Sequence, residues 1–453
     1  MNSPESIRVR SEHLRIGSRL RHSALDENDA LVLTASTEIS ESLKQDLTDR
    51  QILDVFLHPE DASAMFSSPR RSQSPDSASR DSKGGDPSKE FPLESITLVS
   101  QQITEQLEAF AAKIPAAVEN VGPPLRERAN RIGCEPYNQH QQELLTEQFA
   151  TTKKLMDTMI RHAVAGLSQD NRAIHTVARR ASSELIRDSD QAYSASAEVS
   201  QNPGLTDRAI RTSVLAMAIA IEMGWDENLV REVGECGLVH DWGMHRLPEE
   251  IRNKKSELTQ SERKLVAQHP LHTFDLLSKM QNIPDGVRIA AAQVHEKLDG
   301  TGYPRGLMGG QIHPYAKILH IADTYVALTE ETWGRPAYIP YDVMTYLLSQ
   351  VRLNTISSEV MKAMLEVVSL FPIGSHVELT DGTEARVIRR GQGLYTEPVV
   401  QRLDKNRSLR KDAAHDLLVD IANSNVKVSA PLPHPAREER RLDQAAIQEM
   451  PPI

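Results

Sequence analysis

The chain has 453 residues, more than one compact hydrophobic core accommodates, so about two to four domains are expected. Its 52 Lys and Arg against 63 Asp and Glu give a formal net charge of −11, which argues against general electrostatic binding of nucleic acid or anionic membranes. Only Cys134 and Cys236 are present, so neither a disulfide framework nor a cysteine-based zinc site is expected.

Membrane insertion and export are not expected from the sequence. No run reaches the roughly 18 apolar residues that a membrane span needs. The opening residues, MNSPESIRVRSEHL, have no apolar core after their basic residues, unlike a signal peptide. We therefore expect a cytoplasmic protein without a membrane span, and neither DNA nor RNA as a partner.

Residues 1–66 alternate short apolar runs with turn signals and predict a small α+β module. The Asp-Glu-Asn turn beside ALVLT is typical of a β-hairpin, and SESLKQDLTD is typical of a short helix. Residues 67–92 are rich in Ser, Pro, Gly and charged residues. They cannot bury enough apolar surface to offset the entropy of ordering, so we expect a disordered linker there.

Two helical blocks follow the linker. Residues 93–198 carry apolar residues at helical spacing, as in ESITLVSQQITEQLEAFAAKI, and the simplest role for such long helices is dimerisation or binding of a protein partner. Residues 199–370 form the second block, which opens with LTDRAIRTSVLAMAIAIEMGW. Thr206-Asp207 is a good signal for the start of this helix, and Gly224 is a plausible end.

The C-terminal part of the chain changes character twice. Residues 371–428 return to the alternation that is typical of strands, around the turn Asp381-Gly382, and predict a small β module. Residues 429–453 are rich in proline and charge, and we expect a flexible tail. Together the segments predict a mainly α fold, with a helical domain flanked by small α+β and β modules.

Three groups of polar residues in the second helical block each follow an apolar run: His240-Asp241 after ECGLV, His295-Glu296 after VRIAAAQV, and Asp323 after AKILHIA. An isolated histidine is usually an ordinary core or surface residue. A charged aspartate at the end of an apolar segment, however, is costly unless a partner neutralises it. Residues placed in this way converge naturally at one site inside a helical bundle.

The chemistry of such a cluster is that of a metal site. Neutral imidazole together with carboxylate suits Zn, Fe, Mn or Ni, and an aspartate can bridge two ions. Two ions about 3.5–4 Å apart polarise a phosphate and generate hydroxide from bound water. Hydrolysis of a phosphate ester is therefore the activity to expect.

These residues resemble the HD-GYP branch of the HD-domain metal-dependent phosphohydrolases. The resemblance runs from about residue 200 to 370 and rests on His240-Asp241-x-Gly243, LTQSERKLVAQHP, VHEKLDGTGYPRGL and AKILHIADTYVALT. Its most specific part is DGTGYP, residues 299–304. The resemblance implies an all-helical, HD-type bundle that binds two or three metal ions. It also implies hydrolysis of cyclic di-GMP to pGpG or GMP, with some relatives cleaving related cyclic dinucleotides.

Carried over position by position, the resemblance implies a set of functional residues. Asp241 would bridge the ions and serve in catalysis, together with Lys317, which stands where the family usually carries an arginine. Lys317 would also contact the substrate phosphate. The loop residues Gly302, Tyr303 and Pro304 would contact the substrate as well. The implied metal ligands are His240, Asp241, His269, His295 and Asp323.

The chain departs from the family pattern at several positions. The first ligand histidine of the family aligns with Arg208, and the first histidine of the His-His-Glu triplet aligns with Val294. Arg208 places a permanent cation beside the ions unless it turns away or pairs with an anion. Further replacements are Gly204 for an acid, Met244 for a lysine and Val326 for an aspartate.

These departures lower the expected metal content to at most two ions and leave two hypotheses open. His245 and His272 could each share a helix face with a ligand, but a surface histidine is the simpler interpretation for both. The first hypothesis is a working cyclic di-GMP phosphodiesterase with an eroded metal site. The second is a catalytically inactive relative that binds a nucleotide or a protein partner through the same helices.

Overall fold

The computed structural model describes most of the chain. The described residues are 7–11, 14, 16–21, 24–25, 31–33, 37–49, 54–57, 61, 93–115, 117–197, 204–332, 335–403, 417–435 and 437–442. The predicted linker, residues 67–92, lies entirely outside them. The chain divides into two compact units, Met1–Leu98 with Arg161–Gln169, and Val99–Ile160 with Asp170–Ile453. We describe each unit by itself.

The first unit holds a four-stranded antiparallel sheet in the order β1-β4-β2-β3. The predicted hairpin is confirmed, because β2 pairs with β3, and the predicted short helix is confirmed as α1. One apolar core includes Val9, Leu33, Leu47 and Val55, contributed by the strands and the helix. The elements are β1 Ile7–Arg10, β2 Ala24–Leu25, β3 Leu31–Leu33, α1 Glu41–Asp49 and β4 Asp54–Leu57.

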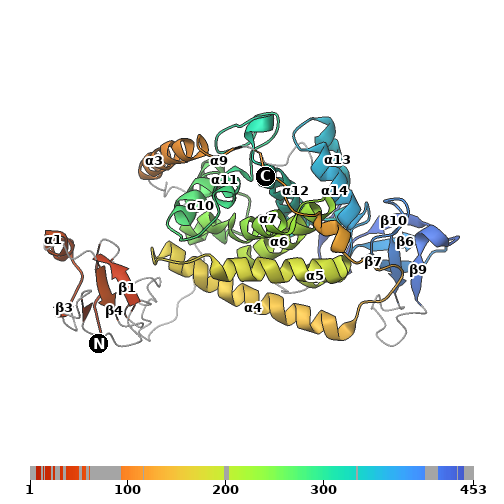
Figure 1. Cartoon of the computed structure of the whole chain (residues 1–453), viewed down its shortest axis with the longest axis horizontal. Coiled ribbons are helices and arrows are strands. Elements are labelled where there is room, and N and C mark those ends of the chain that lie inside the picture. The colour runs from red at the N-terminus through yellow and green to blue at the C-terminus, as the bar shows by residue number, and fades with distance from the viewer. Residues whose placement is uncertain are drawn as a thin grey trace, which may run out of the picture. The chain divides into compact units, whose positions relative to one another are not determined.

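A helical bundle forms the centre of the second unit, and the predicted mainly α fold class is confirmed (Figure 1). Helix α6 lies at its core, because every residue from Ala209 to Ile221 is buried and α5, α7, α12 and α14 all pack against it. No helix among the described residues has the length and apolar character that crossing a bilayer requires. The bundle helices are α6 Leu205–Glu222, α7 Glu227–Val239, α8 Glu249–Arg252, α9 Gln260–Val266, α10 His269–Ser278, α11 Asp285–Gln293, α12 Pro314–Leu328, α13 Pro340–Arg352 and α14 Ser358–Val368.

Helix α6 starts earlier than its sequence suggests. The predicted start at Thr206-Asp207 is wrong by two residues, because Gly204 occupies the N-cap position. Asp207 instead lies in the first turn, where its carboxylate accepts a hydrogen bond from the Gly204 amide at 2.8 Å. This satisfies one of the unpaired amides at the helix start. The predicted end is confirmed, because Gly224 follows the helix with a left-handed φ of 80°.

Most of the helical residues of the segment 93–198 belong to the second unit, namely Val99–Ile160 and the residues from Asp170 onward. Helix α3 (Leu93–Ala111) contributes Ile103 and Leu107 to an apolar cluster with Leu271 and Phe274 of α10. Helices α4 (Gln139–Val164) and α5 (Arg172–Ala197) lie side by side (Figure 1). The second half of α5 is buried among the bundle helices.

Helix α5 bends at Asp188, whose φ of −156° and ψ of 92° are not helical. The buried Arg389 of strand β7 holds this bend with two hydrogen bonds to the Asp188 carboxylate, at 2.8 and 2.9 Å. Its Nε donates to the Glu135 carbonyl oxygen at 2.6 Å, and its guanidinium lies 4.9 Å from the centre of the Tyr137 ring. A charge-assisted, bidentate pair therefore ties the C-terminal sheet to α5.

The C-terminal module is a five-stranded antiparallel sheet in the order β10-β6-β7-β8-β9. The predicted turn is confirmed, because Gly382, with a φ of 80°, lies between β6 and β7. The strands are β6 His376–Leu379, β7 Glu384–Arg389, β8 Val399–Arg402, β9 Leu418–Asp420 and β10 Val428–Leu432.

The expectation of a flexible tail from residue 429 onward is wrong for residues 429–435 and 437–442. Val428–Leu432 pairs with β6 as an edge strand, a position that tolerates its proline. Strand β11 (Glu439–Arg440) pairs with β5 (Ala337–Tyr338). The Asp342 carboxylate then accepts hydrogen bonds from Arg441 Nε and the Leu442 amide, at 2.7 and 3.0 Å.

The contact between α6 and α7 yields a stability prediction. A Cβ atom at Gly237 would lie 2.5 Å from the Ser213 Cα, whereas at Gly234 it would meet the flexible Met217 side chain. Both Gly→Ala changes gain helix propensity, so their difference isolates the clash. Gly237→Ala should be less stable than Gly234→Ala by about 1–3 kcal/mol, measured by chemical denaturation. Equal stabilities would mean that α6 and α7 separate without cost.

Candidate metal centre

His240 follows the last residue of α7 and is buried. Its Nδ1 lies 2.8 Å from the Gly237 carbonyl oxygen. Because a carbonyl only accepts, Nδ1 donates, and in the neutral ring Nε2 keeps its lone pair. Nε2 lies 3.3 Å from Asp323 Oδ1 and 3.6 Å from Asp241 Oδ2. The fold therefore aims one imidazole nitrogen between two carboxylates.

His269, the first residue of α10, is oriented in the same way. Its Nδ1 donates to the Val266 carbonyl oxygen at 2.7 Å. Its Nε2 lies 3.2 Å from Asp241 Oδ1 and 3.1 Å from His295 Nε2. Backbone carbonyls that fix the ring orientation in this manner are a common second layer around metal-binding histidines.

The structure brings the five predicted ligands together, and their role as ligands stays a prediction. Their potential ligand atoms form two groups, in each of which all atoms lie within 4.8 Å of one another. Asp241 belongs to both groups, and each of the five residues is at most 8% exposed. Buried imidazole and carboxylate donors of this kind match the preferences of Zn, Fe, Mn and Ni. The groups are His240 with Asp241 and Asp323, and Asp241 with His269 and His295.

The charges inside the cluster shift its pKa values in opposite directions. Burial opposes a charge on His240, but the carboxylates of Asp241 and Asp323 outweigh it and raise the His240 pKa to about 9. Burial lowers the pKa of His295 to about 3, and the neighbouring His269 contributes in the same direction. His240 is thus the cluster's proton carrier at neutral pH, and His295 is neutral.

The glycine-rich loop lies directly against the cluster. A Cβ atom at Gly302 would be 2.3 Å from the Lys297 nitrogen and 2.5 Å from the His295 carbonyl oxygen, so only glycine fits. The Tyr303 amide donates to that same carbonyl at 3.1 Å. The Tyr303 ring stacks on the His295 ring, with centroids 4.8 Å apart and an angle of 11° between planes. Of the predicted substrate residues, Gly302 and Tyr303 therefore touch a predicted ligand.

Glu296 fixes the remainder of this loop. Its two carboxylate oxygens accept hydrogen bonds from the Arg305 and Leu307 amides, both at 2.8 Å. Pro304 lies between these anchored positions and Tyr303. Glu296, which sequence analysis noted only as part of a motif, is therefore the residue that holds the loop over the cluster.

Lys317 lies on the same helix as one of the five predicted ligands, Asp323. It lies on α12 six residues before Asp323, which places the two residues on different faces of the helix. Burial lowers the pKa of Lys317, and the charge of Glu359 on α14 opposes this shift. Its role at a substrate phosphate stays a prediction.

Arg208 is neutralised by residues that sequence analysis did not connect with it. Its Nη2 donates to Thr332 Oγ1 at 2.6 Å, and its Nε lies 3.6 Å from Glu330 Oε2. Glu330 also pairs with Arg211. Glu330 lies two residues after the last residue of α12 and seven residues after Asp323. Arg208 is thus paired with an anion, and this pairing reduces the repulsion between its positive charge and any bound metal ions.

One histidine beside the cluster escaped sequence analysis. His320 lies on α12 three residues before Asp323, and its Nδ1 donates to the Val294 carbonyl oxygen at 2.8 Å. Burial lowers the His320 pKa to about 4. The spacing of three within AKILHIAD was a usable signal, because residues at i and i+3 share a helix face.

The other histidines considered as substitute ligands are not in either group. His272 is buried, so the interpretation as a surface histidine is wrong, while His245 is half-buried. Burial lowers the pKa of both to about 4. Met244, Val294 and Val326, where the resemblance expects polar residues, are buried.

Comparisons with known proteins agree with this site. Residues 194–356 match the HD domain family. This range contains all five predicted metal ligands. The chain is 31% identical over 193 residues to a cyclic di-GMP phosphodiesterase of Pseudomonas aeruginosa, covering 42% of this chain and 46% of that protein. It is 28% identical over 265 residues to the cyclic di-GMP phosphodiesterase response regulator RpfG of Xanthomonas campestris, covering 58% and 64%.

A third relative, a 3'3'-cGAMP-specific phosphodiesterase of Vibrio cholerae, is 31% identical over 153 residues, covering 33% of this chain and 35% of the relative. Among solved structures, an HDG"Y"P protein from Bdellovibrio bacteriovorus, Bd1817, matches with a TM-score of 0.40 and 15% identity, covering 80% and 99%. The chain spans about half the length of the curated relatives it matches. Residues 194–356 are thus similar to the HD domain family, and the chain is similar to these phosphodiesterases over part of their length.

The raised His240 pKa predicts that metal binding releases a proton. Below about pH 9 the metal-free His240 is protonated, and an ion must displace that proton to reach Nε2. Affinity for Mn²⁺ should therefore rise by up to about tenfold per pH unit between pH 6.5 and 8. Calorimetry in two buffers of different ionisation enthalpy measures the proton release and the number of ions, which should not exceed two.

His272→Gln is the control, because His272 has a lowered pKa of about 4 and carries no proton to release at these pH values. Its proton release should equal that of the unmodified protein. Affinity that does not change with pH, or three tightly bound ions per chain, would contradict the assignment.

Proposed function

We propose that this chain is a metal-dependent phosphodiesterase that hydrolyses a cyclic dinucleotide, with cyclic di-GMP as the first substrate to test. The observation that carries the proposal is the pair of buried donor groups that share Asp241. The names of the relatives in Pseudomonas, Xanthomonas and Vibrio support the substrate class. The loop of Gly302, Tyr303 and Pro304 is the proposed substrate contact, together with Lys317.

The residues present fit a divalent metal centre. His240, Asp241 and Asp323 would hold one ion more tightly, since two carboxylates contribute to it. Asp241, His269 and His295 would hold a second ion. Bound ions of this kind polarise a phosphate and lower the pKa of water until hydroxide forms near neutral pH. Fe, Mn, Ni and Zn all match the donor set, and at most two ions are proposed.

The chain's own residues hold the site in shape. The carbonyl oxygens of Gly237 and Val266 orient His240 and His269, so their Nε2 atoms point at Asp241 before any ion arrives. Tyr303 covers the face of His295, and burial raises its pKa well above the ordinary range, so the phenol stays neutral. A neutral phenol adds no anionic charge where a phosphate is to bind.

A second function rests on a different observation. Arg208 is engaged by Thr332 and Glu330, so it cannot supply the donor that the family resemblance places there. Val294 also supplies none. A site with two fewer donors favours the alternative of a catalytically inactive module that binds a nucleotide or protein through the same helices. Activity and metal content separate the two functions.

The carboxylate shared by both groups gives the most direct test of activity. Asp241→Asn removes a charged ligand from both groups, and cyclic di-GMP hydrolysis should fall by at least about 100-fold. Product formation is measured by chromatography, with Mn²⁺ or Fe²⁺ supplied anaerobically. Asp285→Asn, the same change on the exposed start of α11, is the matched control and should keep full activity. An unmodified protein that binds ions but does not cleave would contradict the phosphodiesterase and favour the binding module.

Restoring the missing family residues tests whether the site is eroded. The triple variant Arg208→His, Val294→His and Met244→Lys adds two imidazoles and one cation. It should hydrolyse cyclic di-GMP at least about tenfold faster than the unmodified protein, which corresponds to an activation barrier lower by ~1.4 kcal/mol. Arg208→Gln is the control, since it removes the cation without adding a strong donor. Glu330 keeps Arg211 as a partner in both. A triple variant that folds, binds two ions and still does not cleave would show that more than the ligands has diverged.

A further inference from the structure

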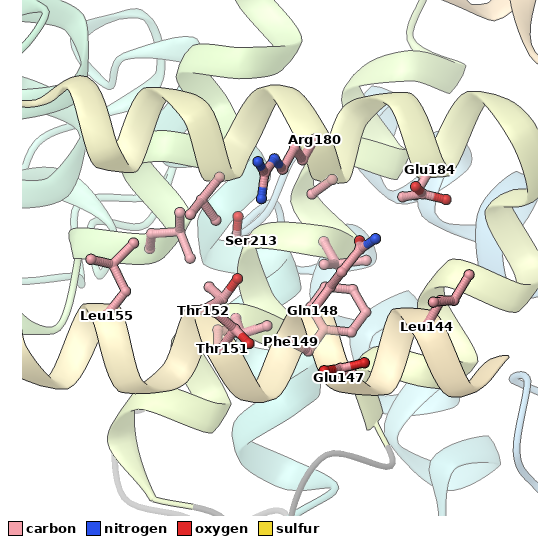
Figure 2. A pocket seen from close by; sticks show the side chains of 15 residues that line it. Leu144, Glu147, Gln148, Phe149, Thr151, Thr152, Leu155, Arg180, Glu184 and Ser213 are labelled. Carbon is pink, nitrogen blue, oxygen red and sulfur yellow. The ribbon is translucent and has the colours of Figure 1, made fainter. Parts of the chain in front are cut away.

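A cavity of about 290 Å³ lies between α4 and α5 (Figure 2). Helices α4 and α5 form its two walls, and α6 and α7 form its floor. Side-chain contacts join these helices, from Gln141 to Glu184 at 3.2 Å and from Lys153 to Asp207 at 2.6 Å. The opening is thus a built feature of the helix packing rather than a gap between separate parts.

We propose that this cavity is a binding site for a small organic anion with an aromatic body, distinct from the site for the cyclic dinucleotide. The proposal rests on the character of the lining, on the charge at its rim and on its size. It does not depend on the phosphodiesterase activity proposed above. None of the cavity's lining residues belongs to the two donor groups.

The lining is largely apolar. Leu144 and Leu155 on α4 are 38% and 36% exposed. They lie eleven residues apart, about three helical turns, so both face the same side of α4. Phe149 lies between them, and Ile210 and Leu238 close the floor. Exposed apolar side chains around a concave surface mark a ligand site. An aromatic body would cover this surface and remove it from water.

Arg180 is the one cation among the lining residues and offers a site for an anion. Arg180 extends from α5 into the space over Ser213 (Figure 2), and among the described residues it has no hydrogen-bond or ion-pair partner. Glu184 is already paired with Arg187, and Glu147 lies across the opening on α4. The guanidinium is therefore the cation left to meet a ligand, and its donors suit a carboxylate, sulfonate or phosphate.

The size of the cavity limits the ligand. About 290 Å³ lies at the small end of ligand pockets, so a molecule of one to a few rings fits, and a dinucleotide does not. The floor residue Leu238 follows Gly237, whose carbonyl oxygen orients His240. A molecule in this cavity therefore contacts the turn of α7 that presents His240.

The test uses 8-anilinonaphthalene-1-sulfonate, an aromatic anion whose fluorescence rises on binding, with the intact chain. Arg180→Gln should weaken binding at least tenfold, and Thr152→Phe, which fills the cavity from α4, should abolish it. Arg179→Gln, an exposed neighbour outside the lining, is the matched control and should bind like the unmodified protein. N-phenyl-1-naphthylamine has the same rings without the sulfonate, so Arg180→Gln should change its binding less than threefold.

Binding that both variants leave unchanged would place the dye elsewhere and overturn the proposal. Equal losses for the sulfonate and the neutral dye in Arg180→Gln would overturn the assignment of an anion. Circular dichroism checks that Thr152→Phe is folded, and Arg180→Gln decides the question if it is not. Light scattering that shows a dimer, dissociated by either variant, would make the cavity an interface between two copies and would also overturn the proposal.

Discussion

The buried carboxylate of Asp241 is the constraint on which the site depends. An anion at the end of an apolar helix is costly unless opposite charge surrounds it. The protein meets this cost with His240 and His269, each turned toward the carboxylate by a backbone carbonyl oxygen. The same geometry that neutralises the aspartate also gathers nitrogen and oxygen donors in one place. The electrostatic need of the fold and the requirements of a metal site therefore coincide.

Sequence analysis located four of the five ligands, His240, Asp241, His295 and Asp323, because they lie at the ends of apolar runs. Burial of the run carries the polar residue at its end into the core, so His240, His295 and Asp323 had to meet if the helices packed as a bundle. His269 lacked this signal and was found only through the family resemblance. The Asp381-Gly382 turn was predictable for a local reason, since its conformation depends on a glycine within the turn itself.

What sequence analysis missed depends on partners far away in the chain. Glu330 neutralises Arg208 from 122 residues away, and no local pattern connects the two. The bend of α5 at Asp188 depends on Arg389, 201 residues later. The strand β10 was missed because its composition resembles a flexible tail, while its pairing partner β6 lies about fifty residues upstream. The composition of a segment predicts its local conformation, whereas these features depend on contacts with residues far away in the sequence.

The ion pair between Arg389 and Asp188 joins the C-terminal sheet to the helical bundle. A shortened chain ending near residue 370 would leave the Asp188 carboxylate without its guanidinium, in the buried half of α5 that packs on α6. A buried anion without its partner is strongly destabilising. The boundary of the family match at residue 356 is therefore not a boundary of folding. Transplanting this domain into another protein requires carrying the terminal strands along with it.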